Sequence, residues 1–402
     1  MISSIAQRVK YYSSFIDHEL IKMYLGGARS EERDPMKHIE AGVDWICHAQ
    51  DAFDGGGVAR SYSLVYHPFF KRRGWFAPYP ETTGYIIPTL FDYGRLVNRQ
   101  EFADRAVRMA DWECRVQLES GAVQGGMIDQ TPTPAIFNTG QVIFGWIRAF
   151  QETGQSTYLL SAVKAGKFLI SQQDEDGAWR KSLSDFTNNS RMNSYTYNTR
   201  TAWALMELAL VTGDEEFEAA AIRNVEFALG QQNENGWFQS NCLTQPDCPL
   251  THTIAYCIRG IMEIGAIMKN QEYLARARRA ADAVLAMQRP DGSLAGRFNE
   301  RWEPAVDWRC LTGEAQMAGI WGRLYQITGR SEYLEGMRRT NSALRKIQFL
   351  HTDHPGLYGG VSGSHPIQGA YGRFEILNWA VKFFVDAQML ERSLTNSGDH
   401  GV

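Results

Sequence analysis

The chain has 402 residues, of which 44% are hydrophobic and 21% charged, so it can bury a large core without disulfides or metal ions. Its 41 basic and 45 acidic residues are well mixed and give a net charge of −4, which excludes a general electrostatic surface for nucleic acid or for an anionic membrane. No stretch of about 18 apolar residues occurs, so no membrane-spanning segment is expected.

The first residues, MISSIAQRVKYYSSF, contain no uninterrupted apolar segment after their basic residues, and we therefore expect a cytoplasmic protein. The six cysteines are scattered and are expected to be free thiols. Cys242, Cys248 and His252 could in principle supply three zinc ligands, but structural zinc sites usually have tighter spacing. We therefore predict no metal and no cofactor.

A turn glycine recurs after a helix end that carries glutamine, as in QLESGAV, QQDEDGAW and QQNENGWF. The six copies are spaced 66, 56, 59, 56 and 64 residues apart. Their glycines are Gly55, Gly121, Gly177, Gly236, Gly292 and Gly356. Self-similarity at such a period indicates an architecture built from repeated units.

A second recurring feature is a short connection followed by an aromatic residue, as in ETGQSTY, VTGDEEF and ITGRSEY. Gly154, Gly213 and Gly329 suit the left-handed residue that ends a helix, and the aromatic residue four positions later can pack back on the hairpin. The aromatic residues are Phe102, Tyr158, Phe217, Tyr273 and Tyr333. Each unit is therefore predicted to be an αα-hairpin.

A threonine stands near the start of the helix that enters each hairpin, and we expect it to be the N-cap. These threonines are Thr83, Thr139, Thr199, Thr253 and Thr312, and the sixth copy, AYGRF, lacks one. The helices that follow them are rich in apolar and small residues and are predicted to be inner helices. The helices that follow the aromatic residues carry more charge, as in QEYLARARRAADAVL, and are predicted to be outer helices.

These features predict an all-α protein in which six hairpins close a ring, an (α/α)6 toroid. Residues 1–35 are expected to form an N-terminal helical extension and residues 36–402 the toroid catalytic domain. The period, the turn formed by Gln173, Gly177 and Trp179, and the threonine-headed helices resemble the (α/α)6 toroids of carbohydrate-active enzymes. The resemblance covers residues 36 to 390 as architecture.

The same fold class serves several chemistries, so motifs must separate them. The segment KAGKFLISQQDEDGAW is similar to the QW repeat of triterpene cyclases, but the acidic DxDD cluster of those enzymes is absent. Lanthipeptide cyclases hold zinc through Cys and Cys-His-Gly signatures, whereas Cys47-His48 is followed by Ala49. Glycoside hydrolases, uronate-directed polysaccharide lyases and sugar epimerases are the main alternatives, and terpene and lanthipeptide cyclases stay as less favoured ones.

The resemblance implies that the starts of the inner helices line a pocket, and these starts are rich in polar residues. The candidate catalytic residues are His252, Tyr197, Glu314, Tyr85 and Glu81. The candidate substrate-binding residues at helix starts are Asn138, Gln141, Tyr195, Asn198 and Arg200. Each could also be structural, because asparagine caps helices and carboxylates are favoured near positive helix ends.

Three loops supply candidate walls, namely residues 62–81, residues 180–197 with Arg191, and residues 296–310 with Arg297. Their aromatic side chains suit stacking on sugars, and their arginines suit pairing with carboxylates. A long glycine-rich segment before the last inner helix is a further candidate. The substrate-binding residues predicted from these loops are Arg72, Arg73, Trp75, Trp308 and Arg373.

Two sugar mechanisms compete. A hydrolase needs two carboxylates that flank the scissile bond, and no spacing pairs Glu81, Glu314 or another acid in this way. A lyase or C5-epimerase removes the proton next to a uronate carboxylate, which calls for Tyr or His as base and acid and for Asn, Gln or Arg around the carboxylate. The residue types favour elimination or C5-epimerisation on an acidic poly- or oligosaccharide, with His252 and Tyr197 as base and acid.

Glycoside hydrolysis and a non-catalytic toroid that binds a glycan or a protein partner stay open as alternatives. The expected partner is a carbohydrate substrate, with no nucleic acid and no membrane, and the sequence does not indicate an oligomeric state. A deep pocket with perturbed Tyr, His or Glu side chains would indicate an enzyme. A flat apolar rim would indicate a binding protein.

Overall fold

The computed structural model describes residues 34–180, 195–242 and 244–398. The predicted N-terminal extension falls almost entirely outside these ranges, and so does Arg191 of the second candidate loop. In the described ranges, none of the helices combines the length and the apolar character needed to span a bilayer.

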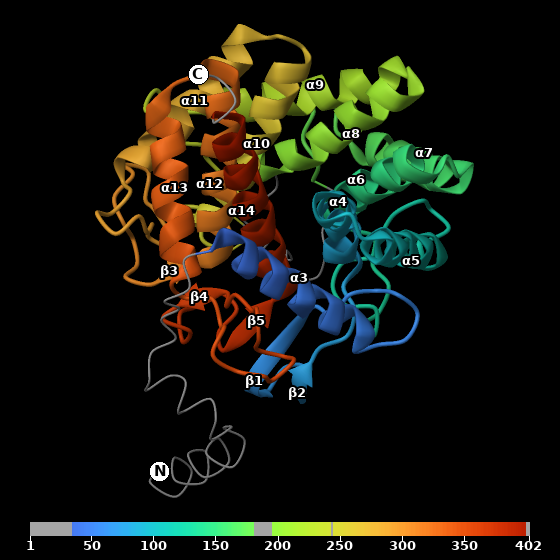
Figure 1. Cartoon of the computed structure of the whole chain (residues 1–402). Coiled ribbons are helices and arrows are strands. Elements are labelled where there is room, and N and C mark those ends of the chain that lie inside the picture. Colours follow the sequence, from blue (N-terminus) through green and yellow to red (C-terminus); the bar gives the residue numbers. More distant parts are fainter. Residues whose placement is uncertain (1–33, 181–194, 243, 399–402) are drawn as a thin grey trace, which may run out of the picture.

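Helices from the two halves of each repeat form two concentric layers (Figure 1). The outer layer consists of α3 (Pro35–Asp51), α5 (Gln100–Val116), α7 (Ser156–Gln172), α9 (Glu215–Gly230), α11 (Gln271–Ala286) and α13 (Ser331–Arg345). The inner layer consists of α4 (Pro80–Val97), α6 (Ile136–Thr153), α8 (Thr199–Thr212), α10 (Thr251–Ile267), α12 (Leu311–Thr328) and α14 (Asn378–Gly398).

The inner helices close into a ring. Each inner helix packs against the next one along the chain, and the last, α14, packs against the first, α4. Five hairpins are consecutive in sequence, whereas the sixth pairs α14 with α3 and so joins the two ends of the fold. The structure confirms the predicted (α/α)6 toroid with alternating outer and inner helices.

The short connections inside the hairpins agree with the sequence. Gly154, Gly213 and Gly329 are left-handed residues at the ends of α6, α8 and α12. The aromatic residue that follows is buried, and Tyr158 donates a hydrogen bond of 2.7 Å to Asp111 of the preceding outer helix. Tyr273 and Tyr333 bind acidic residues in the same way. The aromatic landmark therefore ties neighbouring outer helices together.

The recurring glutamine has a structural role of its own. Gln173 Nε2 donates to the carbonyl of Gly177 at 3.1 Å and to the carbonyl of Ala220 on the next outer helix at 2.9 Å. Gln117, Gln232 and Gln288 repeat this pattern. Gly177 has a φ of +87°, and a Cβ there would lie 2.2 Å from a backbone oxygen of Arg223. Glycine is required because the turn touches the next helix.

The first and sixth copies of this clamp use other glycines than predicted. Gln50 bonds the carbonyl of Gly56, one residue beyond Gly55. In the sixth copy, Gln348 bonds Gly359 and the backbone of His38, while Gly356 does not have a positive φ. The sixth clamp thus reaches back to α3, the first helix of the described residues.

The prediction that threonine caps each inner helix is wrong. The helices α4 and α6 begin at Pro80 and Ile136, so Thr83 and Thr139 lie inside the first turn. Their hydroxyls instead accept backbone hydrogen bonds of 2.9 Å from the preceding loops, at Val58 and Val123. These threonines therefore hold the loops against the inner helices.

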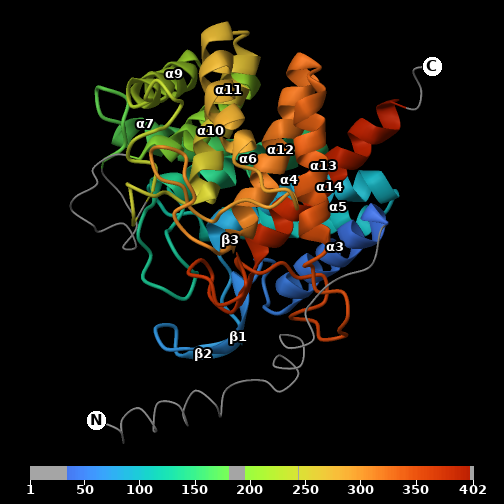
Figure 2. The same ribbon diagram turned by 90° about the vertical axis from the view of Figure 1, so that its left-hand side faces the viewer.

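Short strands gather at the end of the ring where the inner helices begin (Figures 1 and 2). The strands β1 (Ser61–His67), β2 (Arg72–Trp75) and β5 (Glu375–Leu377) form an antiparallel sheet in the order β2-β1-β5. Tyr62 is paired with both Trp75 and Ile376. A second pair joins β3 (Arg309–Cys310) to β4 (Ser364–His365). The sequence analysis did not predict these strands.

Glu113 on α5 is an unpaired carboxyl in the core. It is fully buried, and both of its oxygens lack a hydrogen-bond partner among the described residues. Burial raises its pKa well above the ordinary value. The stability that depends on the protonated carboxyl is thus present below the pKa of the unfolded chain and is lost as the pH rises toward the raised folded pKa.

We therefore expect Glu113→Leu to raise the free energy of unfolding at pH 8 by about 1 to 3 kcal/mol over the natural protein, with a smaller difference at pH 5. Urea unfolding at the two pH values measures both differences. Glu119→Leu, at an exposed position, should show no such pH-dependent gain. An equal effect of Glu113→Leu at both pH values would contradict the buried neutral carboxyl.

Candidate functional site

A cavity of about 420 Å³ opens at the strand end of the toroid, and we call it the mouth cavity. Seven of the predicted site residues line it, from the starts of three inner helices and the short segment before α8. They are Glu81, Tyr85, Asn138, Tyr195, Tyr197, Asn198 and His252. A volume of about 300 to 1,000 Å³ is typical of small-molecule sites.

Several residues of this wall were not among the predicted site residues, namely Arg60, Cys242, Tyr256, Tyr371 and Trp379. Phe70 and Tyr79 lie in the predicted wall of residues 62–81. Tyr256 could have been found, because it lies four residues after His252 on α10 and so shares its helix face. Arg60 and Trp379 carried no signal, since they meet only where the first strand pairs with the last.

Glu81 in the first turn of α4 is held by its neighbours. Tyr79 donates a hydrogen bond of 2.7 Å to Glu81 Oε2, and Asn138 donates to the Tyr79 oxygen at 3.3 Å. Burial raises the pKa of Glu81 to about 7, although the Tyr79 hydroxyl and the charge of Arg60 oppose the rise. Glu81 can therefore carry a proton near neutral pH and release it, as a general acid must.

His252 faces the cavity from the start of α10. Its Nδ1 lies 2.7 Å from Gln316 Oε1, and an amide oxygen can only accept, so Nδ1 carries the proton. Burial lowers the pKa of His252 to about 4, and the nearby charge of Arg200 acts in the same direction. The imidazole is thus neutral at ordinary pH, with the Nε2 lone pair available as a base.

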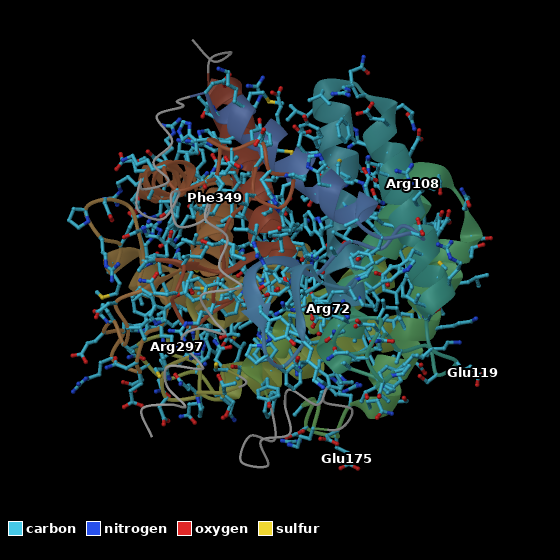
Figure 3. The ribbon with its side chains drawn as sticks, turned by 90° about the horizontal axis from the view of Figure 1, so that it is seen from below. Arg72, Arg108, Glu119, Glu175, Arg297 and Phe349 are labelled. Atoms are coloured by element: carbon cyan, nitrogen blue, oxygen red, sulfur yellow. The ribbon has the colours of Figure 1, made fainter. Side chains whose placement is uncertain are left out.

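Two guanidinium groups line the cavity. Arg60 is paired with Glu375 and lies over the Trp379 ring at 5.2 Å. Arg297 is only 8% exposed and donates to the Cys248 carbonyl at 2.7 Å, but it forms no ion pair with a described carboxylate. Figure 3 shows Arg297 to one side of the strand end of the molecule. A buried cation without a counter-ion is a recognition point for an anionic group.

Aromatic rings form most of the remaining wall. Tyr195 and Tyr197 are stacked with their centroids 5.1 Å apart, and Tyr256 lies 4.4 Å from the His252 ring. The buried hydroxyls of Tyr85, Tyr195 and Tyr256 make no hydrogen bond of ordinary geometry with a described residue. Burial raises the pKa of all three hydroxyls, so they are neutral at ordinary pH.

Glu314, a predicted catalytic residue, lies outside the mouth cavity. It is fully buried, and its two oxygens accept hydrogen bonds of 2.8 and 2.6 Å from Arg309. Oε1 also accepts from the backbone nitrogen of Leu294 at 2.9 Å. Glu314 therefore holds the preceding loop against α12, as Thr83 and Thr139 do in other repeats.

Glu314→Gln is expected to destabilise the fold by about 3 to 5 kcal/mol, because it leaves the buried Arg309 charge unpaired. Urea unfolding at neutral pH measures the loss. Glu332→Gln, which breaks an exposed pair with Arg330, is the matched control and should change stability by less than about 1 kcal/mol. Unchanged stability with abolished activity would instead return Glu314 to the catalytic group.

The other predicted residues also lie outside the mouth cavity. Gln141 and Arg200 bind each other at 3.0 Å deeper in the ring. Arg72 pairs with Asp129 on the surface and lies on the β1–β2 hairpin (Figure 3). Trp75 packs on Trp45, and Arg373 is exposed beside Phe374. Arg73 and Trp308 do not line the cavity either.

The cysteines Cys47, Cys114, Cys242, Cys248, Cys257 and Cys310 are all free thiols. In the part of the chain that the structure describes, no group of three or more His, Cys, Asp or Glu side chains is arranged to hold a metal ion. Cys242 lies beside Arg297, with 3.7 Å between Sγ and the guanidinium nitrogen. The arrangement brings a thiol, not a metal centre, to the cavity wall.

The sequence of the chain matches one known protein family. Residues 10–267 match the model of the squalene-hopene cyclase C-terminal domain, and this range is more than half of the 402 residues. The chain belongs to this family. The match includes the turns in which Gln117, Gln173 and Gln232 fasten successive outer helices. No curated protein sequence matches the chain.

Solved structures with the same fold include several sugar enzymes. The unsaturated glucuronyl hydrolase from Bacillus sp. GL1 is 16% identical, with a TM-score of 0.71 over 90% of this chain and 98% of that chain. The cellobiose 2-epimerase from Bacillus thermoamylovorans B4167 is 13% identical, with a TM-score of 0.68 over 88% and 98%. A sugar epimerase from a ruminal bacterium is 11% identical, with a TM-score of 0.71 over 89% and 98%. At these identities the likeness shows the toroid fold.

Proposed function

We propose that this family member is a carbohydrate-active enzyme that transfers a proton at a carbon of a uronate-containing oligosaccharide, by elimination or C5-epimerisation. The observation that carries the proposal is the acid and base pair in the mouth cavity. His252 is neutral with a free Nε2, and Glu81 holds a proton near neutral pH. The sugar enzymes that share the fold support the same class of substrate.

Arg297 is the candidate partner of the uronate carboxylate. Pairing with a cation draws electron density away from the carboxylate and stabilises the negative charge that develops when the neighbouring C5 proton leaves. The bound carboxylate would also neutralise the buried guanidinium. Asn138, Tyr197 and Asn198 line the same cavity and are the candidates to bind the sugar hydroxyls.

The chemistry begins with His252 Nε2, which takes the C5 proton and leaves an enolate. In elimination, the electron pair forms the C4–C5 double bond, and Glu81 gives its proton to the departing oxygen at C4. In epimerisation, a proton returns to C5 from the opposite face. Tyr197 is a further acid in the same wall, with a pKa that burial raises well above the ordinary value.

Hydrolysis by a carboxylate pair has less support. Such a mechanism needs two carboxyl groups about 5 to 9.5 Å apart, and Glu81 is the one carboxyl among the described residues that line the mouth cavity.

A proton-initiated cyclase is the second candidate function. The family description and the many aromatic rings around Glu81 favour it, since aromatic faces attract cations.

One assay separates these possibilities. The protein is incubated in D₂O with uronate oligosaccharides, the matching neutral oligosaccharides, unsaturated uronyl oligosaccharides and a linear isoprenoid, and the products are followed by mass spectrometry and ultraviolet absorbance. Deuterium at C5 or a new 4,5-unsaturated uronate supports the proposal. Turnover of the isoprenoid alone, of neutral sugars alone, or of no member of the panel contradicts it.

A different result, loss of the ultraviolet absorbance of an unsaturated uronyl substrate, would indicate that the same acid and base pair adds a proton to the sugar instead of removing one. In that case Glu81 protonates C4 and water adds at C5. This outcome would keep the substrate class and replace elimination with hydrolysis. Hydrolysis of unsaturated glucuronyl substrates is the activity named for several structures of this fold.

A further inference from the structure

A second cavity, of about 230 Å³, lies between the inner helices α8, α10, α12 and α14, and we call it the inner cavity. No residue lines both this cavity and the mouth cavity. Two of these helices line both cavities. On α10, His252 lines the mouth cavity and Arg259 the inner cavity, and on α14, Trp379 lines the mouth cavity and Asp386 the inner cavity. The two cavities are therefore at different depths of the ring.

The inner cavity is lined by three cations and a single described acid. The cations are Arg200, Arg259 and Lys382, and the acid is Asp386. Asp386 accepts from Lys382 at 2.5 Å through one oxygen and from Thr89 at 2.7 Å through the other. The wall therefore carries three cations against one described carboxylate.

Arg200 is the more deeply buried of the two, with 7% of its surface exposed. Its Nε donates to Gln141 Oε1 at 3.0 Å, while its two terminal nitrogens form no hydrogen bond or ion pair with a described residue. Its guanidinium lies 4.8 Å from the centre of the Trp203 ring. A ring attracts a cation, but it does not replace the hydrogen bonds that the terminal nitrogens would make in water.

Arg259 is close to the same ring, with 5.4 Å between its guanidinium and Trp203. It is paired with Glu263 at 2.7 Å, and its other terminal nitrogen donates to the Gly319 carbonyl at 3.4 Å. Glu263 is shared with Arg323. Two guanidinium groups therefore share one aromatic ring, and the terminal nitrogens of Arg200 are the ones without a partner among the described residues. Like charges held close together favour an anion between them.

We propose that the inner cavity binds a small inorganic anion, of the sulfate, phosphate or halide class, between Arg200 and Arg259. A guanidinium donates two parallel hydrogen bonds to an oxyanion, and the two terminal nitrogens of Arg200 can supply such a pair, while Arg259 adds a second positive charge. The cavity has room for one tetrahedral oxyanion with its water, but it is about half the volume of the mouth cavity. The proposal of this anion site does not rest on the sugar chemistry proposed above.

Two measurements test the site. Crystals soaked in sodium bromide should show an anomalous peak in the inner cavity beside the Arg200 guanidinium. Calorimetric titration with sodium sulfate in a zwitterionic buffer should show saturable binding, which Arg259→Gln weakens by about 10-fold or more. Titrations with sodium phosphate and sodium chloride then rank the members of the class.

The matched control is Arg323→Gln. Arg323 pairs with Glu263, as Arg259 does, but does not line the inner cavity. The sulfate affinity of Arg323→Gln should stay within about 2-fold of that of the natural protein. No bromide peak in the inner cavity, or equal sulfate affinity in Arg259→Gln and Arg323→Gln, would overturn the proposal. Should Arg259→Gln fail to fold, the bromide peak in the natural protein decides.

Discussion

His252→Ala is expected to lower turnover of the uronate substrate by about 10² to 10⁴-fold, the usual contribution of a positioned base. The fold should survive, because His252 is bonded through one side-chain hydrogen bond, to Gln316, and borders a cavity instead of filling the core. Steady-state rates and urea unfolding, measured on the same preparation, separate lost chemistry from lost stability.

His48→Ala is the matched control, since His48 is exposed in the last turn of the outer helix α3. It should leave both the rate and the stability unchanged. Deuterium incorporation at C5 should disappear in His252→Ala along with turnover. If His252→Ala kept the natural rate of deuterium incorporation, another group would have to be the base.

Gln316 is a positioning residue in this scheme, because its oxygen fixes the proton on Nδ1 and leaves Nε2 free. Gln316→Leu should therefore reduce kcat more than it raises KM. It should also move the acid limb of the pH profile, since Gln316 stabilises the protonated imidazole and so raises the pKa of His252. Removing that contribution lowers the pKa further, so the acid limb should shift to lower pH.

The fold could be predicted from the sequence because its signals recur at the spacing of the repeat. A hairpin turn such as Gly154 acts within a few residues of its place in the chain, whereas Gln173 and Tyr158 each bond a neighbouring outer helix 47 residues away, the same step in successive repeats. The first residue of each inner helix was harder to predict. Thr83 looks like a cap in the sequence, but Pro80 begins the helix a turn earlier and turns Thr83 toward the loop at Val58.

The site was predicted in part for a similar reason. A helix start tells which end of the ring a residue occupies, but not its depth or direction. Tyr197 and Arg200 are three residues apart, yet Tyr197 lines the mouth cavity and Arg200 the inner cavity. Arg60 could not be predicted, because its place depends on β1 pairing with β5 more than 300 residues later, where Glu375 and Trp379 lie.

Glu81→Gln is expected to remove the other half of the proton transfer. The amide keeps an oxygen that can accept from Tyr79, but it cannot give up a proton to the departing oxygen, so turnover should fall by about 10² to 10⁴-fold. The loss should shrink with substrates whose leaving group is acidic enough to depart without protonation. Asp129→Asn, which breaks the surface pair with Arg72, is the control and should leave the rate unchanged.

The pH dependence of kcat/KM tests the roles of His252 and Glu81 separately. The base His252 must be neutral, so kcat/KM should rise with pH through the pKa of about 4. The acid Glu81 must be protonated, so kcat/KM should fall as the pH passes about 7. Glu81→Gln should abolish the fall near pH 7 and keep the rise near pH 4, because the amide does not titrate. A descending limb that persists in Glu81→Gln would assign the acid to another group, with Tyr197→Phe as the next variant to measure.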